Sequence, residues 1–120
     1  MKPVLLLALC LLASCAALQR NAAETLVGEW RYSDDIQAGR YVFNRDGTFK
    51  AEVVYHGELI SKATGRWAIE GGNLNYTYIS DKLDRIPAGA TDQDKLLKVR
   101  AKFFIIEAAD GKRRKYLRIW

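Results

Sequence analysis

The sequence predicts an all-β fold, a small antiparallel up-and-down meander or barrel of about seven to eight strands. From Leu26 onward, short runs alternate apolar and polar residues, as strands with one buried face do. Gly, Asn and Asp separate these runs, and Asp46-Gly47 is a strong hairpin signal because glycine adopts positive φ without steric cost. Almost none of this part of the chain shows a helical period, so helices are not expected to build the core.

The chain begins with a signal-peptide pattern. Lys2 precedes an apolar run of about ten residues, which is the length of a signal-peptide core, whereas a membrane-spanning helix needs about 20. The run ends in Leu12-Ala13-Ser14-Cys15, which matches the bacterial lipobox of an aliphatic residue, two small residues and a cysteine. Residues 1–14 are therefore predicted to be a lipoprotein signal peptide, and Cys15 the residue that carries acyl chains such as palmitate. The alternative is an ordinary signal peptide cut near Ala16-Ala17.

Lipidation of Cys15 would decide where the protein acts. Two or three acyl chains anchor a protein stably in a bilayer. The residue after Cys15 is alanine, and in this the segment resembles lipoproteins of enteric bacteria that are transported to the outer membrane. We therefore expect a cell-envelope protein on the outer membrane, facing the periplasm. Residues 15–25 are predicted to be the lipidated N-terminus and a flexible tether, and residues 26–120 the β domain, which would have no disulfide because Cys10 leaves with the signal.

The strands are predicted from the alternating runs. Asp46-Gly47 and Asp110-Gly111 mark two hairpin turns, and residues 70–73 mark a third. The acidic segment 81–95, which contains Pro87 and Gly89, is predicted to be a long loop. The predicted strands are residues 27–32, 39–44, 49–56, 59–69, 74–79, 98–107 and 112–120.

The order of several short motifs resembles that of small bacterial lipocalin-like domains found behind lipoboxes. Gly28-Glu29-Trp30 and Gly65-Arg66-Trp67 are G-x-W motifs, and Asp46-Gly47-Thr48-Phe49 lies between them. The resemblance implies that Trp30 or Trp67 plugs one end of a barrel, with Gly28 or Gly65 allowing close strand approach. The chain departs from full-sized lipocalins because it is short, lacks their C-terminal helix and shows no clear arginine closing motif.

The resemblance also implies a function in binding. A small apolar or amphipathic molecule would lie against aromatic walls that carry a few polar tips. The alternative is an envelope-structural or protein-interaction module with a filled core and no small ligand. A cavity above about 300 Å³ lined by tyrosines would favour the first, and a filled core the second. The candidate ligand-binding residues are Trp30, Tyr41, Phe43, Tyr55, Trp67, Tyr76, Tyr78 and Phe103.

Basic residues gather near the C-terminus, and the chain has a formal net charge of +5. On neighbouring strands, side chains that share a face would form a cross-strand basic surface of Lys98, Arg100, Lys102 and Arg114. Such a surface could hold anionic lipid or glycan, or it could be an ordinary solvated face. Nucleic acid is not expected as a partner outside the cytoplasm.

No residue set predicts catalysis. His56 is the single histidine and falls on the polar side of a predicted strand, which argues against a zinc site. The acidic residues Asp81, Asp84, Asp92 and Asp94 do not have the spacing of an EF-hand calcium loop. The sequence also lacks a G-x-S-x-G elbow and a phosphate-binding glycine loop. We therefore expect neither enzymatic activity, nor a cofactor, nor a metal.

Overall fold

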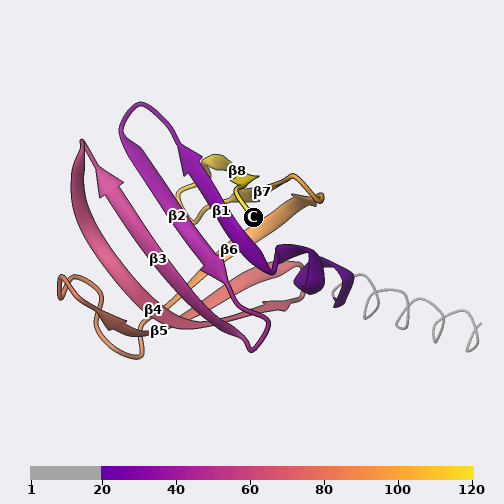
Figure 1. The fold of residues 1–120 in the computed structure, drawn as a ribbon, viewed down its shortest axis with the longest axis horizontal. Helices are drawn as coiled ribbons and strands as arrows, with labels where there is room; N and C mark the ends of the chain where they lie inside the picture. Colours follow the sequence, from indigo (N-terminus) through magenta and orange to yellow (C-terminus); the bar gives the residue numbers. More distant parts are fainter. Residues whose placement is uncertain (1–19) are drawn as a thin grey trace, which may run out of the picture.

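A computed structural model describes residues 20–120, whose strands form a single closed sheet. The predicted signal peptide of residues 1–14 and the predicted lipidation site Cys15 lie outside the described residues. Eight antiparallel strands follow one another around the barrel, and the last pairs with the first (Figure 1). The predicted all-β barrel is confirmed. The strands are β1 (Gly28–Ser33), β2 (Gln37–Phe43), β3 (Thr48–Tyr55), β4 (Glu58–Glu70), β5 (Asn73–Asp81), β6 (Thr91–Val99), β7 (Phe103–Glu107) and β8 (Arg113–Arg118).

A short helix over residues 20–26 precedes β1 and packs against one end of the barrel (Figure 1). Leu26 at its end is fully buried, and the Thr25 hydroxyl donates to the Asn21 carbonyl at 2.8 Å. Residues 20–25, which the sequence predicted as tether, therefore differ from the prediction, because alanine-rich sequence becomes helical once a neighbouring surface buries Leu26. Within residues 20–120, no helix has the length and apolar character that crossing a bilayer requires.

The C-terminal third contains one strand more than predicted. The segment 81–95 is a loop only over residues 82–90, and β6 starts at Thr91. The predicted strand 98–107 is instead interrupted by a turn at residues 100–102, which joins β6 to β7. The turn and a bulge between Leu96 and Lys98 shift the alternation, so that Phe104 points inward where the sequence predicted Phe103. Polar residues in β6 concealed this strand, which pairs with β5 across the loop of residues 82–90 and with β7 across the turn.

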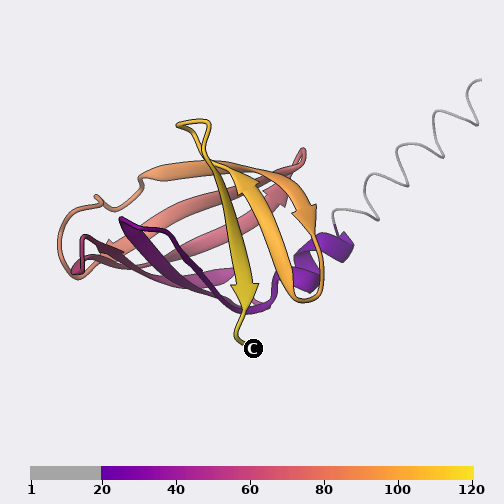
Figure 2. The same ribbon diagram turned by 90° about the horizontal axis from the view of Figure 1, so that it is seen from above.

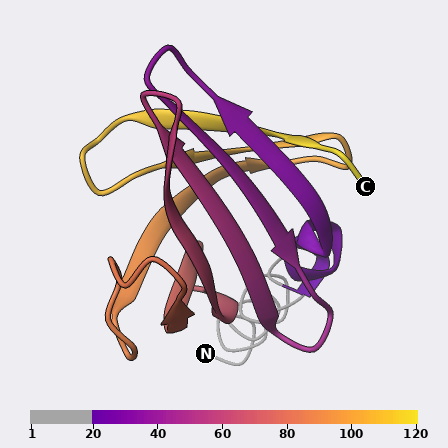
Figure 3. The same cartoon turned by 60° about the vertical axis from the view of Figure 1, so that its left-hand side comes forward.

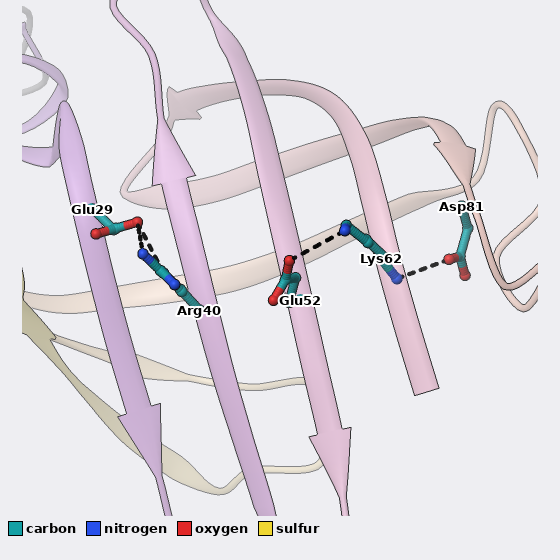
Figure 4. Close-up of polar contacts among 5 residues, drawn as sticks. All are labelled: Glu29, Arg40, Glu52, Lys62 and Asp81. Carbon is teal, nitrogen blue, oxygen red and sulfur yellow. Dashed lines mark hydrogen bonds and ion pairs between the residues drawn. The ribbon is translucent and has the colours of Figure 1, made fainter. Parts of the chain in front are cut away.

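The two ends of the barrel differ. The closed end holds the helix, the β2–β3, β4–β5 and β6–β7 turns and the C-terminus, and the open end holds the remaining turns (Figure 2). Ion pairs join neighbouring strands on the outer face (Figure 4). Lys62 reaches its register partner Glu52 at 3.8 Å, and Arg40 reaches Glu29, two residues along β1 from its register partner Arg31, at 2.7 Å. Such exposed pairs contribute little stability, so the interior must hold the fold.

Candidate functional site

Aromatic side chains fill the closed half of the barrel. Trp30 is fully buried, lies edge-on to Phe104 at 4.8 Å between ring centroids, and donates from its indole N–H to the Leu26 carbonyl at 2.9 Å. Trp67 packs against Phe43 at 5.1 Å and donates to the Asn44 carbonyl at 3.0 Å. Both G-x-W tryptophans therefore lie toward the same end, and this half of the interior has no room for a ligand.

The glycines of the two motifs permit this close packing. A Cβ atom on Gly28, whose φ is +137°, would lie 2.4 Å from the Arg118 guanidinium. A Cβ atom on Gly65 would lie 2.7 Å from the Phe49 ring and 2.2 Å from the Thr77 carbonyl oxygen. Strand approach at both motifs thus requires glycine, as the resemblance implied.

An arginine closes the barrel at Trp30, although the sequence showed no clear closing motif. The guanidinium of Arg118, on β8, lies 4.2 Å from the centre of the Trp30 ring. It donates to the carbonyl of Ala101 at 2.5 Å, of Val27 at 3.0 Å and of Trp120 at 2.7 Å, and to that of Thr25. Arg118 therefore joins the helix, the β6–β7 turn and the C-terminal residues to the first strand.

Five tyrosines occupy the interior from the middle of the barrel toward its open end. The Tyr41 ring contacts those of Tyr32, Tyr76 and Tyr116 at centroid distances of 6.4, 6.0 and 5.6 Å. Tyr78 stacks beside Tyr76 at 6.4 Å. Strand pairing sets the order of these tyrosines along β1, β2, β5 and β8. Trp30 pairs with Tyr41, and Tyr32 pairs with Gly39, whose missing side chain leaves room for the Tyr32 ring. We call these five residues the tyrosine cluster.

A buried polar group in this region lacks a partner. The Tyr76 hydroxyl has no hydrogen-bond partner among residues 20–120. Asp94, on β6, is a carboxyl group that is only 8% exposed. A buried polar group without a partner costs about 1–3 kcal/mol, so groups of this kind mark a place where water or a ligand belongs.

Burial sets the protonation states of the cluster. It raises the pKa of Tyr41, Tyr76 and Tyr116 well above the usual value of 10.0, so their hydroxyls stay neutral donors. Burial, together with repulsion from Asp92, also raises the pKa of Asp94 to about 6, while the Arg114 charge partly offsets this. At neutral pH the open end therefore combines neutral hydroxyls with an Asp94 carboxyl group that is mostly ionised and becomes protonated below its pKa of about 6.

Arg114 belongs to the open end and not to the predicted basic surface. Its guanidinium lies 5.5 Å from the centre of the Tyr32 ring, donates to Gln37 Oε1 at 3.4 Å and approaches Asp110 at 3.9 Å. Arg114 pairs with the buried Ile106, so its side chain starts from the inner face of the barrel. Lys98, Arg100 and Lys102 are exposed at the closed end instead.

The structure places the eight candidate ligand residues in three environments. Trp30, Phe43 and Trp67 are core residues of the closed half, and Tyr41, Tyr76 and Tyr78 belong to the tyrosine cluster. Tyr55 is 46% exposed at the end of β3 and meets the His56 ring edge-on outside the barrel. Phe103 lies on the outer face beneath Lys98 and Lys115, at 5.9 and 4.6 Å. Sequence reasoning missed Tyr32, Tyr116 and Asp94. Alternation in β1 would have placed Tyr32 inside together with Trp30, whereas the inward position of Asp94 required the register of β6.

The acidic loop has a structural role. Asp81 accepts backbone N–H groups of Lys62, Leu83, Arg85 and Ile86 at 3.0–3.2 Å (Figure 4 shows the bond from Lys62). Burial opposes ionisation of Asp81, but these four donors outweigh it and hold its pKa below the usual value. Within residues 20–120, no group of three or more His, Cys, Asp or Glu side chains is arranged to hold a metal ion.

A broad hollow lies outside the barrel. It has a volume of about 900 Å³ and lies over β4, β5 and β6. The polar side chains that line it belong to the outer face of the sheet, because they alternate along the strands with the inward-facing Trp67 and Tyr76. They are Arg66, Asn75, Thr77 and Gln93. This hollow reaches Tyr76, and a separate groove beside β1 and β8 reaches Tyr32, so each contacts one member of the tyrosine cluster.

Comparison with known proteins identifies the class of fold. No protein-family model matches the chain, and no curated protein matches it. A solved lipocalin-like protein from Bacteroides uniformis superposes with a TM-score of 0.57 at 18% identity, covering 79% of this chain and 99% of that one. A second protein from Bacteroides uniformis, solved by NMR, gives a TM-score of 0.56 at 19% identity, covering 81% and 91% of the two chains. The fold is therefore lipocalin-like.

Proposed function

We propose that this protein is a lipid-anchored component of the bacterial cell envelope whose barrel binds a small amphipathic molecule at its open end. The carrying observation is the buried, unpartnered Tyr76 hydroxyl inside the tyrosine cluster. The rings supply apolar walls, and the Tyr76 hydroxyl and the Asp94 carboxyl supply polar contacts. A guest would enter by displacing the Arg114 side chain from Tyr32 and Gln37, since this contact crosses the open end.

The anchor is the second half of the proposal. The lipobox ending at Cys15 supports it. The helix of residues 20–26 lies at the closed end of the barrel, so this end would face the bilayer. Expression with labelled palmitate, followed by membrane fractionation, tests this directly. We expect label in the unaltered chain and none in Cys15→Ser, which should also leave the membrane fraction. Equal fractionation of both proteins would contradict the anchor.

Ligand binding is tested with one hydroxyl. We expect Tyr76→Phe to weaken binding of the fluorescent probe N-phenyl-1-naphthylamine about tenfold, which corresponds to about 1.4 kcal/mol. The same change should leave the free protein at least as stable, because it keeps the ring and removes an unpaired buried donor. Tyr55→Phe, which alters an exposed tyrosine outside the barrel, is the matched control. Unchanged binding in Tyr76→Phe would refute the site.

A second candidate function is an interaction module that holds no small molecule. The packing of Trp30, Phe43, Trp67 and Phe104 favours it, because the closed half of the barrel is filled. Native mass spectrometry of the detergent-extracted protein separates the two functions. A co-purifying small mass supports the binding protein, whereas the bare acylated chain, together with failure to bind the probe, supports the interaction module.

A further inference from the structure

The surface around the helix combines exposed cations with an exposed tryptophan. Trp120 is 81% exposed, and the neighbouring Ile119 is also exposed. Lys98, Arg100 and Lys102 project from the end of β6 and the β6–β7 turn, and Arg20 begins the helix. We define the anchor-end surface as Arg20, Lys98, Arg100, Lys102, Ile119 and Trp120.

These residues form one continuous and well-supported surface. Asn21 and Thr25 of the helix line one groove together with Lys98 and Arg100. The backbone N–H of Arg118 donates to the Lys102 carbonyl at 3.0 Å, and the Trp120 carbonyl accepts from Glu29 at 3.3 Å. Figures 2 and 3 show the helix, the β6–β7 turn and the C-terminus on the same side of the barrel. The surface is therefore held in place by the contacts of Arg118.

The chain length before the helix brings this surface to a bilayer. Four residues lie between Cys15 and Arg20, and the five Cα–Cα steps that join them span at most about 18 Å when fully extended. We propose that the anchor-end surface docks on the headgroups of an anionic phospholipid bilayer, an inference that rests on the proposed lipid anchor.

The chemistry of the surface fits this partner. Lysine and arginine are attracted to anionic headgroups within about one Debye length, and tryptophan prefers the interface between headgroups and acyl chains. The anchor-end surface carries four basic side chains, and the helix beside them carries a single carboxylate, Glu24. Docking would fix the barrel with its closed end on the membrane and its open end toward the aqueous phase.

The test uses the full lipidated protein in phosphatidylcholine vesicles, with and without phosphatidylglycerol, and with acyl chains that carry bromine. Bromine quenches tryptophan fluorescence on contact. Trp30 and Trp67 are buried in the barrel, so quenching reports on Trp120, and Trp120→Phe verifies this assignment. We expect at least threefold more quenching in the anionic vesicles, and loss of this excess at about 1 M salt, where the Debye length is about 3 Å.

Two triple variants identify the surface. Lys98→Gln, Arg100→Gln and Lys102→Gln together should abolish the excess quenching. The control replaces three exposed cations at the open end, Lys82, Arg85 and Lys112, by glutamine and should retain it.

Several outcomes would overturn the docking proposal. Equal quenching in neutral and anionic vesicles would do so, as would equal effects of both triple variants. A Trp120 side chain that is shielded from water but not quenched would indicate a protein partner or a second copy instead. Flotation with neutral vesicles tests the lipid anchor separately. If the protein fails to float with neutral vesicles but binds anionic vesicles, the anchor is refuted and the docking proposal still holds.

Discussion

Replacement of Arg118 should destabilise the barrel more than replacement of any other arginine on β8. Its guanidinium donates to four carbonyl groups that belong to the helix and its exit, the β6–β7 turn and the C-terminus. It also covers the Trp30 ring at 4.2 Å. Arg118→Gln shortens the side chain and removes the charge, so all of these contacts are lost together.

The expected magnitude follows from the contacts. A hydrogen bond from a charged donor contributes about 1.5–3 kcal/mol, and a cation–π contact about 0.5–2 kcal/mol. The contacts of Arg118 are coupled, and the carbonyl groups near the surface regain water when the arginine is lost, so the sum is an upper bound. We expect a loss of about 3 kcal/mol in the free energy of unfolding, which lowers Tm by roughly 12–24 °C for a domain of this size.

Thermal unfolding followed by circular dichroism measures this loss. Arg113→Gln is the matched control, because Arg113 is exposed on the same strand and should change stability by about 0.5 kcal/mol or less. Arg118→Lys keeps the charge without the planar fork and should lose most of the same stability. The reasoning is refuted if Arg118→Gln melts within a few degrees of the unaltered protein, or if Arg118→Lys is fully stable.

Three further changes test other parts of the structure. Gly39→Ala should cost about 1–3 kcal/mol in urea unfolding, because its Cβ would lie 2.2 Å from the Tyr32 ring; an unchanged midpoint would contradict this packing. Asp81→Ala should speed hydrogen exchange at Leu83 and the other loop amides, and the stability that ionised Asp81 contributes should disappear as the pH falls below about 4; amides that stay protected would contradict this. Asp94 acts in the opposite direction: its raised pKa, about 6, should make the protein up to about 3 kcal/mol less stable as the pH rises from 4 to 7, and Asp94→Asn should remove that slope.

The sequence predicted the fold best where local signals agree. In residues 26–79, alternation and glycine turns coincide, and the strands there begin and end within a few residues of the prediction. The C-terminal third was harder, because β6 carries charged residues on both faces and its pairing with β5 is not local. The turn at residues 100–102 contains neither glycine nor proline, so the sequence had no signal that would divide the predicted strand.

The candidate site was partly predictable for the same reason. Aromatic residues on strands that the sequence predicted correctly, such as Tyr41 and Tyr76, could be assigned to the interior from alternation alone. The inward position of Asp94 required the register of β6, and the role of Arg118 required knowledge that β8 closes on β1. Contacts of this kind depend on the three-dimensional arrangement of distant segments, and no local pattern encodes them.

The closure of the sheet has a consequence for how copies of this protein would meet at high concentration. Every strand has neighbours on both sides, so no long row of free backbone N–H and C=O groups is offered to another copy. The seam is the weak point, because β1 and β8 share two register pairs, Trp30 with Arg118 and Arg31 with Leu117. Opening it would create two unpaired strand edges at once. We expect the contacts of Arg118 to oppose this opening, and with it the pairing of the exposed strand edges with another copy.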